Sequence, residues 1–80
     1  MKVWTCTMTD CYFGETVLLG VFSTRNTAEQ QAQIWLTGET EGAFKLIDID
    51  DDYMYYCNIY EKKYKYTAHF EEFTINEFSY

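Results

Sequence analysis

The chain has 80 residues, with thirteen acidic and six basic side chains that give a formal net charge of −7 at pH 7. This length corresponds to one small domain. A hydrophobic share of 48% and an aromatic share of 20% exclude a disordered chain, because large rings bury enough surface to offset the lost backbone entropy. The negative charge disfavours binding to nucleic-acid phosphates and to anionic membranes. It is also what keeps a small protein in solution.

The cysteines and the N-terminus indicate in which cellular compartment the protein is expected. Cys6, Cys11 and Cys57 are an odd number, and Met1–Thr5 contains no long apolar run of the kind found in signal peptides. No stretch approaches the roughly eighteen apolar residues that a membrane span requires. We therefore expect a cytoplasmic protein without a membrane partner.

The first two predicted elements are strands joined as a hairpin. Lys2–Met8 alternates side chains and is rich in β-branched and aromatic types, which favours a strand. After a turn over Thr9–Glu15, the almost continuously apolar run Thr16–Phe22 predicts a central strand that folds back on the first.

One helix is predicted over about residues 24–37. Ser23, Thr24 and Thr27 are alternative capping residues at its start. Gly38 suits the left-handed position that ends a helix. The apolar stripe expected to face the sheet consists of Ala28, Ala32, Trp35 and Leu36.

The second half of the chain predicts further strands. Phe44–Asp50 alternates as a strand does, and we expect its two isoleucines, Ile47 and Ile49, to face the helix. Tyr53–Tyr60 and Tyr64–Phe70 flank a short turn and predict a second hairpin.

The end of the chain completes the predicted fold. Phe73 and Ile75 alternate with polar residues, which predicts a last edge strand or a docked tail before Phe78 and Tyr80. The sum is a single α+β domain of residues 1–80, with an antiparallel sheet of four to five strands in the order β-β-α-β-β. The helix covers one face, and the other is open to solvent or to a partner.

The start of the chain resembles a known group of proteins. Residues 20–29 read GVFSTRNTAE and follow a strand that opens MKVW. Over roughly the first 36 residues this resembles small uncharacterised acidic proteins of bacteriophages and their hosts. The resemblance implies a short, early-expressed protein of a class that often binds and disables a host enzyme in the host cytoplasm, and it transfers no functional residue.

The same strand-to-helix turn also looks like that of the N-terminal hybrid-binding domain of some ribonucleases H. The basic and aromatic residues expected there are reduced in this chain to Arg25 and Phe22. Hybrid binding is therefore not predicted.

The spacing of possible ligands along the sequence decides whether a metal site is predicted. Cys6, Cys11, Cys57 and His69 match the number of ligands in a Cys3His zinc site, but Cys57 and His69 are too far apart for its second ligand pair. Buried structural cysteines are the better interpretation. The acidic run Asp48–Asp52 lacks the glycine and the final glutamate of a calcium loop, so a solvated turn is favoured. No metal or other cofactor is predicted.

Catalysis and nucleic-acid binding find little support. His69 has no nucleophile in a recognisable motif, and no glycine-rich phosphate loop is present, so we predict a protein that is not an enzyme. Tyr60–Tyr66 interleaves lysines with rings as single-strand binders do, but three lysines are too few.

The functional prediction rests on the acids and aromatics that crowd Asp48–Tyr80. Such surfaces contact basic macromolecules. We predict a non-enzymatic module, an inhibitor or adaptor that occupies a basic groove on a host protein. The alternative is a self-associating homodimer. Alternate strand residues lie roughly 7 Å apart, about twice the rise per nucleotide of DNA, so Asp48, Asp50 and Asp52 would give a partial nucleic-acid mimic. The predicted partner-binding residues are Asp48, Asp50, Asp51, Asp52, Tyr53, Tyr55, Tyr56, Tyr60, Tyr64 and Tyr66.

Overall fold

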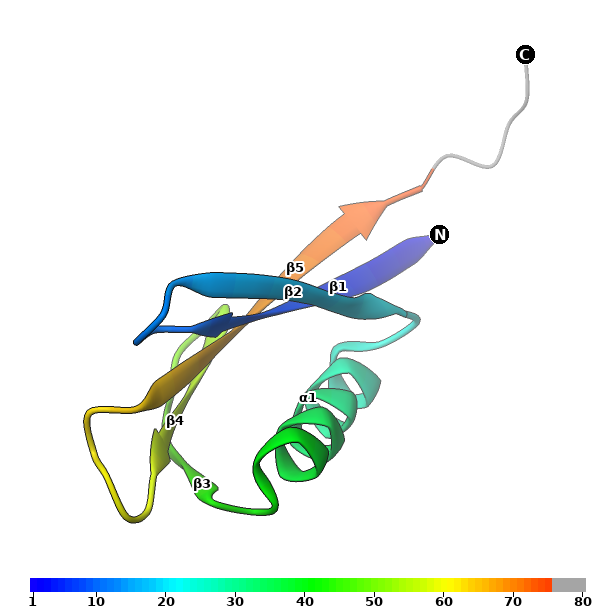
Figure 1. Ribbon diagram of the computed structural model, residues 1–80. Helices are drawn as coiled ribbons and strands as arrows, with labels where there is room; N and C mark the ends of the chain where they lie inside the picture. The colour runs from blue at the N-terminus through cyan, green and yellow to red at the C-terminus, as the bar shows by residue number, and fades with distance from the viewer. Residues whose placement is uncertain (76–80) are drawn as a thin grey trace.

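The computed structural model describes residues 1–75 as one helix packed on a five-stranded antiparallel sheet (Figure 1). The strands lie side by side in the order β2-β1-β5-β4-β3. This confirms the predicted α+β class with one helix on the sheet; Phe78 and Tyr80 lie outside the described residues. The elements along the chain are β1 (Lys2–Asp10), β2 (Glu15–Phe22), α1 (Arg25–Thr40), β3 (Phe44–Ile49), β4 (Tyr53–Asn58) and β5 (Lys65–Thr74).

The centre of the sheet is the long pair formed by β1 and β5. They are paired along their whole length, from Lys2 opposite Thr74 to Asp10 opposite Tyr66. Phe73 lies opposite Val3 within this pair, so the prediction of a separate last edge strand is wrong. One continuous strand is favoured because β1 offers it a partner as far as Lys2.

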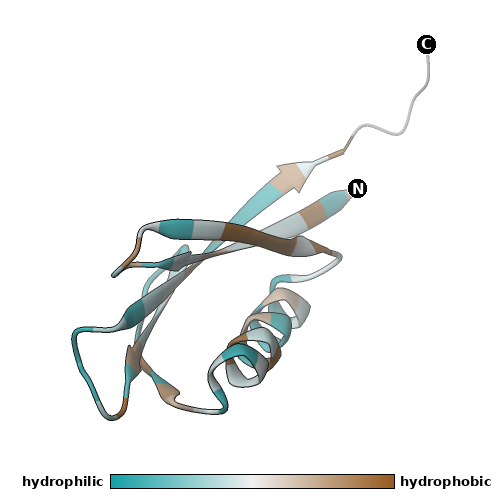
Figure 2. Cartoon of the chain, viewed as in Figure 1, coloured by the Kyte–Doolittle hydropathy of each residue, from teal (hydrophilic) through white to brown (hydrophobic). Residues whose placement is uncertain are grey.

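Strand β2 forms the hairpin with β1 that the sequence predicted, but it lies at the edge of the sheet. The prediction of a central strand is therefore wrong. Apolar side chains remain exposed along it, as the brown segment of β2 in Figure 2 shows, with Leu18 at 58% and Val21 at 60%. A register shift opposite Cys6 and Thr7 makes a bulge, which disturbs the alternation of a regular strand.

Helix α1 begins where one of the predicted caps places it. Thr24 Oγ1 accepts a hydrogen bond from the backbone N–H of Thr27 at 3.1 Å. The helix continues past Gly38 to Thr40, and its left-handed C-cap is Glu41, with φ 55°. Gly38 is therefore not the cap. The chain reverses at Glu41 and Gly42, whose N–H groups bond to Thr37 O, so the glycine that tolerates positive φ lies after the helix.

The core forms where the helix meets β1, β4 and β5. Ala28, Ala32 and Leu36 are fully buried, which confirms the predicted stripe, while Trp35 is only partly buried at its edge. The alanines let the helix approach the sheet closely. The sheet residues they pack against are Cys6, Met8, Met54, Tyr56, Ala68 and Phe70.

Strand β3 contributes less to this core than predicted. Ile47 and Ile49 are 50% and 58% exposed, so the prediction that they face the helix is wrong. A register irregularity between Leu46 and Asp48 leaves Ile47 without a cross-strand partner. The strand also lies at the edge of the sheet, where only Phe44 at its start packs against the core.

A larger side chain at a fully buried alanine of the helix tests how closely this core is packed. We expect Ala32→Leu to lower the free energy of unfolding by about 1–3 kcal/mol, because Ala32 is fully buried against the sheet. Gln31→Leu is the matched control on the exposed side, with a change of less than about 0.5 kcal/mol. Urea unfolding measures both, and equal losses would contradict the close packing.

The phenol of Tyr56 is a second test. Its hydroxyl is buried without a hydrogen-bond partner among the described residues. Burial, followed by the charges of Cys6 and Glu29, raises the pKa of Tyr56 to about 12. Because the folded pKa lies above the unfolded value of 10.0, the stability contribution is complete below pH 10 and is lost as the pH rises towards 12.

We expect Tyr56→Phe to raise the free energy of unfolding by about 1 kcal/mol at pH 7 and to flatten its decline above pH 10. Denaturant unfolding across this pH range measures both effects. Tyr53→Phe, at an exposed tyrosine of the opposite face, is the control. A loss of stability in Tyr56→Phe at pH 7 would show instead that the hydroxyl is hydrogen-bonded.

Candidate functional site

The predicted acidic cluster forms the tight turn between β3 and β4. Strand β3 ends at Ile49, and Asp50 N–H bonds to Tyr53 O at 2.8 Å. Asp50 Oδ1 accepts the N–H of Asp51 at 2.8 Å. The strand therefore does not continue to Asp52, and the predicted regular row of Asp48, Asp50 and Asp52 is not formed.

Arg25 holds this turn against the start of the helix. Its guanidinium donates to the carbonyl oxygens of Asp51 and Asp50 and lies 5.1 Å from the ring centre of Phe70. It also pairs with Glu29 at 3.9 Å. The turn is thus positioned through its backbone, while all its carboxylates stay exposed.

Two of the predicted tyrosines lie beside the turn on the open face of the sheet. The rings of Tyr53 and Tyr55 stack at 6.0 Å between centres, and Tyr53 also stacks on His69 at 4.7 Å. Asp48 lies opposite Tyr55. Burial raises the pKa of Tyr55, and the negative charge of Asp50 adds to it. The structure therefore brings this part of the predicted surface together.

The other predicted tyrosines lie elsewhere, and the prediction is corrected for two of them. Tyr56 is fully buried and Tyr66 is partly buried on the helix side, because alternate residues of a strand face opposite ways. Tyr60 is 81% exposed at the far end of β4, and Tyr64 packs there against Tyr12 at 4.8 Å.

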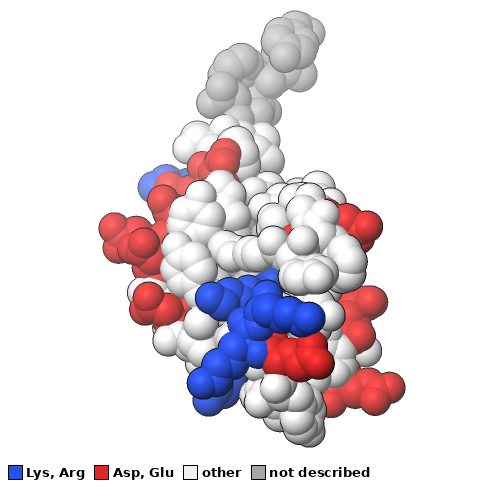
Figure 3. All heavy atoms as spheres, turned by 60° about the vertical axis from the view of Figure 1, so that its left-hand side comes forward, with Lys and Arg blue, Asp and Glu red and all other residues white. Residues whose placement is uncertain are grey.

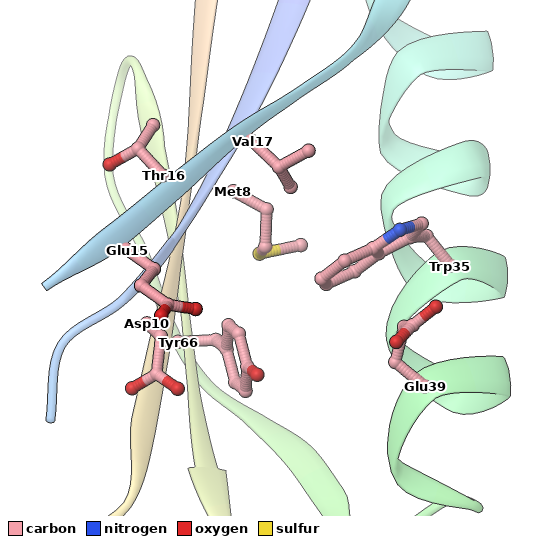
Figure 4. A pocket seen from close by; sticks show the side chains of 8 residues that line it. All are labelled: Met8, Asp10, Glu15, Thr16, Val17, Trp35, Glu39 and Tyr66. Atoms are coloured by element: carbon pink, nitrogen blue, oxygen red, sulfur yellow. The ribbon is translucent and has the colours of Figure 1, made fainter. Parts of the chain in front are cut away.

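A pocket of about 230 Å³ opens on the helix side, between the end of α1 and the paired ends of β1 and β2 (Figure 4). We call it the acidic pocket. Residues from four elements line it. They are Met8, Asp10, Glu15, Thr16, Val17, Trp35, Glu39 and Tyr66.

Three carboxylates meet at the acidic pocket. Asp10 and Glu15 are directly paired across the β1–β2 hairpin, and Glu39 projects from the last turn of α1 on the other side (Figure 4). Asp10 Oδ1 accepts the N–H groups of Tyr12 and Phe13 at 2.9 and 3.1 Å, which fixes that carboxylate at the hairpin turn. Carboxylates that line one pocket raise the local concentration of cations there.

Two aromatic rings form the wall of the acidic pocket. Trp35 and Tyr66 meet edge to face at 6.0 Å between centres, and Phe44 supports Tyr66 from behind at 5.0 Å. Burial raises the pKa of Tyr66, and the charges of Asp10, Glu39 and Glu15 raise it further. The phenol therefore stays neutral among these carboxylates.

The acidic pocket was not among the sites predicted from the sequence. Its acids come from three separate segments that only the hairpin and the helix bring together. One signal was present: Asp10 and Glu15 flank the four residues that form the first turn, so a tight hairpin places them opposite each other. Glu39 has no comparable local signal.

The four residues that match the ligand number of a zinc site do not come together. Cys6 faces the helix and is fully buried, while Cys11 is exposed and bonds to Thr67 Oγ1 at 3.2 Å. His69 stacks on Tyr53. Within residues 1–75 no group of three potential ligands could hold a metal ion.

The comparisons with known proteins give no relative. No family model, no curated protein and no solved structure matches the chain. In residues 1–75, the one helix is too short and too polar to cross a membrane.

The three thiols should differ in reactivity. Burial raises the pKa of Cys6 to about 11, and Cys57 is buried as well, whereas Cys11 is exposed. We expect a disulfide reagent at pH 8 to modify one thiol rapidly and the other two only on unfolding. Absorbance of the released thiolate measures this, and Cys11→Ser should abolish the fast phase. Fast modification of a second thiol would contradict the described burial.

Proposed function

We propose that the protein is a non-enzymatic protein-binding module whose acidic pocket takes a basic side chain of a partner protein. The observation that carries this proposal is the meeting of Asp10, Glu15 and Glu39 with Trp35 and Tyr66 in one cavity. Carboxylates attract a cation, and the face of an aromatic ring stabilises it further.

The size of the pocket favours a side chain over a free metabolite. About 230 Å³ lies below the range of roughly 300–1,000 Å³ typical of small-molecule sites. An arginine suits it better than a lysine, because a planar guanidinium pairs with two carboxylates at once and stacks on rings. The net charge of −7 would steer a basic partner to this surface.

The narrower hypothesis is an inhibitor that occupies a basic groove on a host protein. Asp48, Asp50, Tyr53 and Tyr55 lie together and are available as a second contact. The regular spacing of aspartates that nucleic-acid mimicry requires is not formed. The hypothesis of an inhibitor therefore depends only on the negative charge and the aromatic rings of this surface.

Self-association remains the alternative, and strand β2 favours it. This edge strand exposes Leu18 and Val21 and carries a single charge, at Glu15. Natural edge strands are usually protected against pairing by several charges, by proline or by a bulge; β2 has the bulge only.

Titration with N-acetyl-arginine-amide tests the proposal. We expect saturable shifts of the Trp35 indole signal in NMR spectra, and none with the neutral isostere N-acetyl-citrulline-amide. Replacing Glu15 and Glu39 together by glutamine should weaken binding by about tenfold, as the loss of two exposed ion pairs of up to about 1 kcal/mol each implies.

Glu41→Gln is the matched control, because Glu41 is exposed at the end of α1 and does not line the pocket. It should bind as the wild type does. Equal binding of citrulline, or an equal loss in Glu41→Gln, would contradict the proposal. A tight homodimer in sedimentation, abolished by Leu18→Lys, would support the alternative.

A further inference from the structure

A second cavity, of about 390 Å³, lies where β3 and β4 meet the turn between β4 and β5. We call it the basic pocket. No acidic side chain is among its lining residues in the part of the chain that the structure describes. These residues are Lys45, Ile47, Cys57, Asn58, Ile59, Lys62 and Lys65. We propose that the basic pocket binds a phosphate monoester, that is, a dianionic phosphate group carried on an apolar body.

The sheet register places two of the lysines on either side of Cys57. Lys45 lies opposite Cys57, and Cys57 lies opposite Lys65. All three side chains therefore project from one face of the sheet, the face that the helix leaves open. Neighbouring strands are about 4.8 Å apart, so the backbones of the two lysines lie roughly 10 Å apart with β4 between them. An anion above Cys57 would relieve the repulsion between the two ammonium groups.

The turn after β4 brings the third lysine to the same place. Asn58 Oδ1 accepts the N–H groups of Tyr60 and Glu61 at 2.8 and 2.9 Å, which fixes the turn. The thiol of Cys57 donates to Lys62 O at 3.5 Å. Lys62 is thus tied to the floor of the pocket by a backbone contact.

These lysines are not neutralised within the described structure. The ion pairs there engage Lys2, Arg25 and Lys63, and they engage none of the three lysines of the pocket. Figure 3 shows most of the basic side chains in this view gathered in one group, with acidic atoms directly beside it and other acidic side chains towards the margins. The chain as a whole carries a charge of −7. Salt screens interactions between exposed charges that are more than about 8 Å apart, so the pocket keeps a local positive field.

The composition of the lining points to the class of ligand. Three ammonium groups match a phosphate monoester, which carries about −1.5 to −2 charges at pH 7 and three acceptor oxygens. Ile47 and Ile59, 50% and 47% exposed, provide an apolar wall for the organic part of the ligand. A carboxylate or a sulfate ester carries only one charge and leaves more of the lysine charge unmatched.

Phenyl phosphate is the probe for this site. In NMR titrations of the full chain at pH 7.5, we expect saturable shifts of the amides of Lys45, Cys57 and Lys65, with those of Lys2 and Thr74 unchanged. Phenyl sulfate has the same shape and one charge less, and it should bind about fivefold more weakly. Binding of phenyl phosphate should weaken at pH 5, because its second pKa is near 6.

Two neighbouring lysines make a matched pair of variants. Lys62→Gln removes a charge that lines the pocket, whereas Lys63→Gln removes one from the same turn that does not. We expect the first to weaken phenyl phosphate binding about fivefold and the second to leave it within twofold. Unchanged thermal unfolding would show that both variants fold.

Three results would overturn this inference: no saturable shift, phenyl sulfate binding as tightly as phenyl phosphate, or equal losses in the two variants. The basic pocket does not rest on the proposed function. Lys62→Gln should leave the binding of N-acetyl-arginine-amide unchanged, and replacing Glu15 and Glu39 should not weaken phenyl phosphate, so either site can fail alone.

Discussion

The close contact between α1 and the sheet is the constraint on which the rest of the structure depends. Ala28 and Ala32 are fully buried against a sheet that offers Ala68 at its centre, and small residues on both sides bring the backbones together. With the middle of the helix fixed, its two ends are fixed as well. Arg25 then reaches the turn between β3 and β4, and Glu39 lies over the end of the first hairpin.

This arrangement separates the acids of the acidic pocket from the lysines of the basic pocket. The acidic pocket lies on the helix side beside β1 and β2, whereas the basic pocket lies beside β3 and β4 on the open face. If the lysines of the basic pocket lay beside the acids of the acidic pocket, they would form ion pairs with each other and would be less available to a ligand. Held on different faces of the sheet and screened by salt, each set keeps its field for a ligand of the opposite sign. The two proposed sites are compatible for this reason.

The sequence predicted those features that depend on neighbouring residues. The helical stripe ending at Leu36, the cap at Thr24 and the first hairpin follow from local periodicity and capping chemistry. The order of the strands does not, because it depends on which distant segments pair. An apolar run such as Thr16–Phe22 is typical of a central strand, yet β2 lies at the edge. The bulge at Ile47 likewise leaves no trace in the pattern of hydrophobic residues.

The tyrosines show why the structure brings only part of the predicted surface together. Tyr55 and Tyr56 are neighbours in the sequence, but the alternation of a strand puts one on the open face and the other in the core. The number of rings in a segment does not tell which of them are exposed and which are buried, because this depends on the face that the helix covers. Tyr66 was predicted to anchor a partner beside Asp48, and the structure places it instead against Asp10. The rings expected at one surface therefore divide between two faces, and Tyr66 lines the acidic pocket beside acids from other segments.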